Sequence, residues 1–108
     1  MFAVIYRGYV KDECETKYQG LWNIVATYFV KECGALDSTL HKTEEGMWLA
    51  YSKWPNKATR DAAWPAPGKD LNAALPLHIL EAINGLKQCL ETEKQLPELC
   101  MEVIEEIS

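Results

Sequence analysis

Few side chains in this sequence could do chemistry, and most of them lie in its first two thirds. His41 could act as a base, because imidazole is the side chain that exchanges a proton near neutral pH. Arg7 could hold the anion that such a proton transfer leaves behind. We therefore expect His41 and Arg7 to be catalytic. The aromatic side chains that could form the walls of a substrate pocket, or donate a hydrogen bond into it, are Tyr6, Tyr51, Trp54 and Trp64.

Each of these residues also has a purely structural interpretation, and the sequence leaves both open. His41 could be solvated or lie at an interface, and Arg7 could be an ion-pair partner between two subunits. Trp54 could pack in the core, and the two tyrosines could be core or interface residues. Trp64 is the better pocket candidate, because it stands beside a proline-rich loop and loops often cover sites.

Other kinds of site find little support. The two histidines form no HExxH motif or His/Cys cluster, and no GxSxG, P-loop or GxGxxG motif is present. We expect no metal and no cofactor. The four cysteines contain no CxxC pair, and we interpret them as buried thiols that act as small hydrophobic groups; they are Cys14, Cys33, Cys89 and Cys100.

Composition places the chain among ordinary globular domains. It has 108 residues, a net charge of −5 and 48% hydrophobic residues, which suits one domain over residues 1–108. An acidic chain without a Lys/Arg cluster repels phosphates, so we expect no nucleic-acid partner. The apolar runs are too short to cross a membrane, and the first residues lack the basic start of a signal peptide. The predicted location is the cytoplasm.

The first half of the chain predicts a strand, a helix and a hairpin. Residues 2–10 alternate as a strand with apolar residues on both faces. A helix follows from about 13 to 32, with Asp12 and Glu15 spaced as a capping box and Gly34 just past its end. Strands at 36–43 and 47–54 flank Gly46, which can take the positive φ of a short hairpin loop.

The second half predicts a broken helical region and a last strand. A short helix covers 57–63, a Pro/Gly-rich break follows, and Pro76 opens a helix with the stripe Ile79, Ile83, Leu86 and Leu90. A final strand covers 99–107. The order β-α-β-β-α-β predicts an α+β, ferredoxin-like fold with one antiparallel sheet and its helices on one face.

Such a fold leaves the other sheet face uncovered. Both the first strand and the 47–54 strand carry apolar residues on their two faces, so a monomer would expose an apolar patch. Two-fold dimers are the commonest oligomers. We therefore expect a homodimer in which sheet packs on sheet.

The hairpin also carries a family resemblance. The segments at 34–42 and 46–55, the opening at 6–11 and the stretch 57–64 together resemble the antibiotic biosynthesis monooxygenase domain family, over about residues 2–64. The resemblance implies a dimeric α/β barrel with a small pocket per subunit between sheet and helices. It also implies a cofactor-independent monooxygenase that acts with O₂ on a small aromatic molecule of the phenol, quinol or anthrone type.

Three other functions remain open from the sequence. A non-enzymatic dimer could bind a small apolar ligand with the 65–76 loop as its rim, or the pocket could be filled by its own aromatic side chains. A haem-degrading relative would use an Asn on the first strand, a Trp and an axial His. Trp64 and His78 lie loosely where the last two would fall, but the first strand has no Asn.

Overall fold

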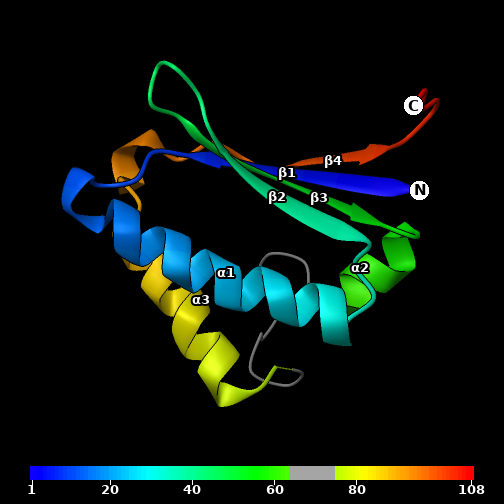
Figure 1. Cartoon of the computed structure of the whole chain (residues 1–108), viewed down its shortest axis with the longest axis horizontal. Coiled ribbons are helices and arrows are strands. Elements are labelled where there is room, and N and C mark those ends of the chain that lie inside the picture. The colour runs from blue at the N-terminus through cyan, green and yellow to red at the C-terminus, as the bar shows by residue number, and fades with distance from the viewer. Residues whose placement is uncertain (64–74) are drawn as a thin grey trace.

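The computed structural model describes residues 1–63 and 75–108. Figure 1 shows its elements, which are the strands β1 (Phe2–Gly8), β2 (Asp37–Lys42), β3 (Trp48–Trp54) and β4 (Leu99–Glu102), the helices α1 (Glu15–Glu32), α2 (Lys57–Ala63) and α3 (Leu77–Cys89), and the short 3-10 turns η1 (Asp12–Cys14) and η3 (Thr92–Lys94). The helical region after the hairpin is divided into α2 and α3, as predicted. The α+β, ferredoxin-like order is confirmed.

One four-stranded sheet organises the molecule. Its strand order is β2-β3-β1-β4, and every neighbouring pair is antiparallel. The helices α1 and α3 lie together beneath one face of the sheet, and Figure 1 shows no helix above the other face. The register places Val4 opposite Ser52 and Cys100, and Ser52 opposite Ser38, so these four side chains share a face.

The alternation of side chains defines two faces. The helical face contacts the core and comprises Phe2, Val4, Tyr6, Ser38, Leu40, Lys42, Trp48, Ala50, Ser52, Trp54 and Cys100. The open face comprises Ala3, Ile5, Arg7, Asp37, Thr39, His41, Leu49, Tyr51, Lys53, Leu99 and Met101. The predicted uncovered face is therefore present in the single chain.

The core lies between the helical face and the two long helices. Val4 is fully buried, and Ile79 of α3 is 1% exposed. Phe29 of α1 packs edge-to-face on Trp54, with ring centroids 6.0 Å apart. Val25 and Ile83 complete the contact between α1 and α3. This packing holds α1 at a fixed distance below the sheet.

Local signals were partly right. Gly34 and Gly46 have φ of 86° and 95°, as predicted for a residue just past a helix end and for a hairpin loop. The predicted capping box is wrong, because a 3-10 turn occupies residues 12–14 and α1 begins at Glu15 without a side-chain cap. The last strand ends at Glu102 rather than 107, because its partner β1 begins at Phe2.

The helices of the described ranges are too short or too polar for a membrane span.

Candidate functional site

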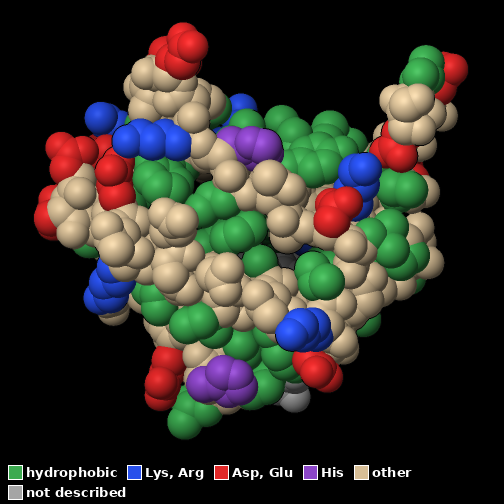
Figure 2. All heavy atoms as spheres, viewed as in Figure 1, with side chains coloured by type: hydrophobic (Ala, Val, Ile, Leu, Met, Phe, Trp, Pro, Cys, Tyr) green, Lys and Arg blue, Asp and Glu red, His purple; other side chains and the backbone are tan. Residues whose placement is uncertain are grey.

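A groove runs between α1 and the edge strand β2. It encloses about 860 Å³ and opens on the side of the molecule seen in Figure 2, where hydrophobic side chains show between polar rims. Its wall on the helix side is formed by Thr16, Gln19, Gly20, Trp22 and Asn23, and its wall on the sheet side by residues 38–42 and Trp48. Most of these side chains are polar, and Trp22, Leu40 and Trp48 supply the apolar part of the lining.

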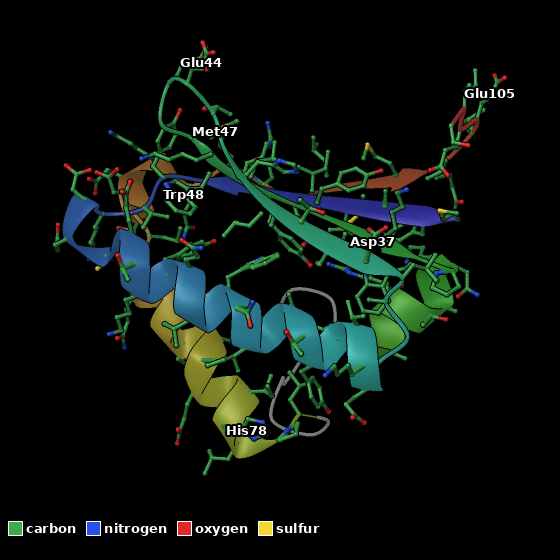
Figure 3. All side chains as sticks on the ribbon, viewed as in Figure 1. Asp37, Glu44, Met47, Trp48, His78 and Glu105 are labelled. Atoms are coloured by element: carbon green, nitrogen blue, oxygen red, sulfur yellow. The ribbon has the colours of Figure 1, made fainter. Side chains whose placement is uncertain are left out.

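Trp48 forms the inner end of this groove. Figure 3 shows that it points from β3 toward α1. Its ring packs edge-to-face on Tyr18, with centroids 5.5 Å apart, and Lys42 Nζ lies 5.7 Å from its centroid. Lys42 also pairs with Glu15 at 2.7 Å, which joins the sheet to the first turn of α1. Among the described residues, the buried indole N–H of Trp48 has no acceptor.

His41 borders the groove from β2. The strand is at the edge of the sheet, so residues of both its faces reach the groove, and His41 is exposed there. Of the five predicted site residues that the structure describes, His41 is the one that lines this groove. Its role as a base stays a prediction.

A buried polar cluster occupies another part of the helical face. Arg60 of α2 is 4% exposed and reaches two partners there. Its Nη2 donates to both carboxylate oxygens of Glu98 at 2.9 Å and to the hydroxyl of Tyr6 at 3.2 Å. The thiol of Cys100 donates to Glu98 at 3.6 Å. This cluster fixes α2 against β1 and the segment before β4.

Burial and pairing shift the protonation of this cluster. Burial raises the pKa of Tyr6, and the hydrogen bond from Arg60 offsets part of that rise. Burial alone would lower the pKa of Arg60, but its bonds to Tyr6 and Glu98 outweigh burial and raise it. Arg60 therefore stays charged, and Tyr6 stays a neutral phenol that accepts from it.

The other predicted residues are spread over two faces. Arg7 and Tyr51 lie on the open face, where Arg7 Nη2 donates to the carbonyl of Pro97 at 3.0 Å. Tyr6 and Trp54 lie on the helical face, and Trp54 is 4% exposed in the core. Trp64 and most of the expected 65–76 rim lie outside the described residues. The structure thus does not bring the predicted set into one pocket of the single chain.

Several functional candidates escaped sequence reasoning. Trp22, Trp48 and Arg60 were assigned no role, although Trp48 was visibly on the same strand face as Trp54. Arg60 shares a helix face with Ala63 three residues on, and both are buried. The sequence carries no local signal for the burial of Arg60, because its partner Glu98 lies 38 residues further along the chain.

The candidate metal ligands, His78 and the cysteines lie apart from the groove or from one another. Within the two described ranges, no three His, Cys, Asp or Glu side chains gather as metal ligands. His78 is exposed at the start of α3 and lies far from the sheet in Figure 3, so it does not face the groove. The expectation of buried cysteines holds only for Cys89, since Cys100 is exposed and Cys14 and Cys33 are half-buried.

The site and fold define a small α+β domain with a groove under one sheet edge, and solved structures show the same architecture. No protein-family profile and no curated protein matches the sequence. SnoaB, a cofactor-independent oxygenase from Streptomyces nogalater, is 13% identical, with a TM-score of 0.72 over 98% of this chain and 95% of its own.

Two further structures agree. A candidate antibiotic biosynthesis monooxygenase from Deinococcus radiodurans is 19% identical, with a TM-score of 0.72 over 100% of this chain and 97% of its own. Rv0793 from Mycobacterium tuberculosis is 15% identical, with a TM-score of 0.71 over 99% and 98%. At these identities the similarity shows the fold. The chain therefore has the fold of the antibiotic biosynthesis monooxygenases, as the resemblance predicted.

Proposed function

We propose that this protein is a cofactor-independent monooxygenase that acts with O₂ on a small aromatic substrate of the phenol, quinol or anthrone type. The observation that carries the proposal is the groove between α1 and β2, with two tryptophans and His41 on its walls, in a fold shared with a cofactor-independent oxygenase. The indole faces suit a flat aromatic ring, and the polar rim suits its oxygens.

The chemistry needs little from the protein. His41 removes a proton from the bound substrate, and the resulting electron-rich anion supplies electrons to O₂. In an anthrone-type substrate a methylene becomes a carbonyl, and the second oxygen atom leaves as water, so no external reductant is needed. Lys42 lines the groove and is the cation on its wall that could face the anion, in exchange for its present pairing with Glu15.

Oxygen consumption by the purified, metal-free protein tests this function. A panel of anthrones, naphthoquinols and catechols should include one class with saturable, protein-dependent uptake. His41→Ala should then reduce turnover by about 10²-fold or more, the usual contribution of a positioned base. His78→Ala is the matched control, because it removes the other histidine from the exposed end of α3. Equal turnover in wild type and a folded His41→Ala variant would remove His41 from the mechanism.

A non-enzymatic ligand-binding protein is the second candidate. It is favoured because two polar groove side chains are already paired with residues outside the groove, Lys42 with Glu15 and Ser38 with Ser52 at 2.9 Å, and so are not free for catalysis. Saturable quenching of tryptophan fluorescence by an aromatic ligand, with no O₂ uptake and no product, would favour binding over catalysis.

We also propose that a second copy covers the open face. Ile5, Leu49 and Tyr51 are only half-buried there, and Leu99 is 41% exposed. Beyond β4, Ile104 and Ile107 are 91% and 89% exposed in a segment that projects past the sheet in Figure 1. Burying these side chains would remove apolar surface from water. Light scattering at micromolar concentration should give about twice the chain mass, and a mass equal to one chain would refute the dimer.

The dimer bears on the predicted site. Arg7 and Tyr51 lie on the face that a second copy would cover, so we expect them to act at the interface and not in the groove. The cytoplasmic location stays a prediction.

A further inference from the structure

Two of the four cysteines lie together, although they are far apart in the sequence. Cys14 ends the η1 turn directly before α1, and Cys89 is the last residue of α3. The backbone N–H of Lys11, three residues before Cys14, is bonded to the carbonyl of Cys89, and the Cys14 side chain is near enough to raise the pKa of Cys89. The proposed oxygenase chemistry uses neither of them. Cys33 lies at the other end of α1, and Cys100 lies in β4 beside Glu98.

The backbone holds this pair in place. The N–H of Lys11 donates to the carbonyl of Cys89 at 2.8 Å, and the N–H of Cys14 donates to the carbonyl of Lys11 at 2.9 Å. Val10 and Leu90 form an isolated antiparallel bridge directly beside these bonds. The proximity of the two thiols is therefore built into the junction of two chain segments, and it does not depend on side-chain rotamers alone.

The two thiols differ in access. Cys89 is 1% exposed, whereas Cys14 is half-buried and reachable from solvent. A dissolved oxidant can therefore meet Cys14 first, while Cys89 approaches it from inside the protein. This arrangement has the two parts of a reversible thiol site, an accessible cysteine and a resolving cysteine next to it.

We propose that Cys14 and Cys89 form a reversible intramolecular disulfide when the protein meets a disulfide oxidant such as glutathione disulfide. The Cys14 thiolate attacks one sulfur of glutathione disulfide, which forms a mixed disulfide and releases one glutathione thiolate. Cys89 then attacks the Cys14 sulfur and releases the second glutathione. The two protein thiols give up two electrons and two protons, and glutathione disulfide takes them up as two glutathione thiols.

The second step should be the slower one. Burial, and then contact with Cys14, raise the pKa of Cys89, while Lys17 and Lys11 offset part of that rise. A raised pKa leaves less of the thiolate that attacks. The finished bond would join the start of α1 to the end of α3. Because α1 forms one wall of the groove from Thr16 onward, oxidation would fix that wall at its first turn.

The test uses a Cys33→Ser/Cys100→Ser variant, in which only the proposed pair remains. Both replaced cysteines are exposed or half-buried, so this variant should fold. After incubation with glutathione disulfide, the protein is denatured and alkylated. We expect no alkylated thiol, an intact mass lower by two hydrogens, and a Tm higher by about 5 °C or more, because the bond closes a long loop. Dithiothreitol should reverse all three changes.

A further Cys14→Ser exchange in the same background is the control, and it should leave Cys89 free and the Tm unchanged on oxidation. The proposal is overturned if both thiols of the test variant are still free to be alkylated after oxidation. It is also overturned if glutathione stays attached to Cys14, or if a disulfide links two chains. These outcomes do not depend on O₂ uptake, so they stand apart from the proposed oxygenase function.

Discussion

The two faces of the sheet have similar sequences but different surroundings. On the helical face Phe2 and Trp54 are each 4% exposed and Val4 is fully buried. On the open face, the half-buried Ile5 and Tyr51 alternate with them along the same strands. Strand alternation alone gives both faces apolar side chains. The difference arises because α1 and α3 pack on only one of them.

The predicted site residues are divided between these two faces. By strand alternation, three of them point to the open face, namely Arg7, His41 and Tyr51. Tyr6 and Trp54 point to the helical face. The groove lies at the boundary between the faces, under the β2 edge, where His41 and Trp48 both reach it. A site built from one chain must use this boundary or the helical face.

Two aromatic residues of β3, one on each face of the sheet, should contribute very differently to the free energy of unfolding. Trp54→Ala should lower the free energy of unfolding by about 3–5 kcal/mol, because it empties a buried aromatic position in contact with Phe29. Tyr51→Ala, on the open face of the same strand, should cost about 1 kcal/mol. Urea denaturation measures both losses, and Trp54→Phe gives a smaller loss in the same direction if Trp54→Ala does not fold.

The stability losses of these two variants should depend differently on protein concentration. A second copy on the open face would make the effect of Tyr51→Ala grow with concentration, because association stabilises the folded chain by mass action. Equal losses at Trp54 and Tyr51 in dilute solution would show that the two faces do not differ as described.

The fold was predictable from sequence because its signals are local. Gly34 and Gly46 mark a helix end and a hairpin, and the helix predicted over 57–63 is present as α2 with those bounds. The site was less predictable, since the contact of Arg60 with Glu98 depends on how α2 packs against a segment far along the chain. Likewise, alternation could not tell which face of β1 the helices would cover.

A buried and an exposed ion pair of α2 should also differ in how much they stabilise the fold. Arg60→Met should lower the free energy of unfolding by about 2 kcal/mol, below the range for fully buried pairs because Glu98 is 27% exposed and can take up water. Lys57→Met removes the exposed pair with Asp61 and should cost less than about 0.5 kcal/mol.

Urea denaturation of both variants measures this difference. The double variant Arg60→Met/Glu98→Gln should lose less than the sum of its single changes, because the two side chains share one interaction. Strict additivity would show that the pair contributes no coupling to stability.

A third prediction concerns association through the open face. Leu49→Lys places a charge on that face and should raise the dimer dissociation constant at least about tenfold, which corresponds to about 1.4 kcal/mol. Ile24→Lys is the control, because Ile24 is a 46% exposed side chain on α1, away from the sheet. Sedimentation over a concentration series measures both. If Ile24→Lys weakened association as much as Leu49→Lys, the interface would lie elsewhere.

The phenol of Tyr6 on the helical face should make a small contribution to the pH dependence of stability. Burial raises the pKa of Tyr6, so the folded protein holds this phenolic proton more tightly than the unfolded chain. The resulting stability is present below the unfolded value of about 10 and is lost as pH rises through the folded pKa. Tyr6→Phe should therefore lose less stability than wild type between about pH 9 and pH 11.

At neutral pH the order reverses, since Tyr6→Phe removes the hydrogen bond from Arg60 and should cost about 1 kcal/mol. The two stability curves should thus converge as pH rises, and thermal unfolding in a pH series measures this. Parallel curves would mean that Tyr6 binds its proton equally in both states, and that the helical face around Arg60 is more hydrated than its 4% exposure indicates.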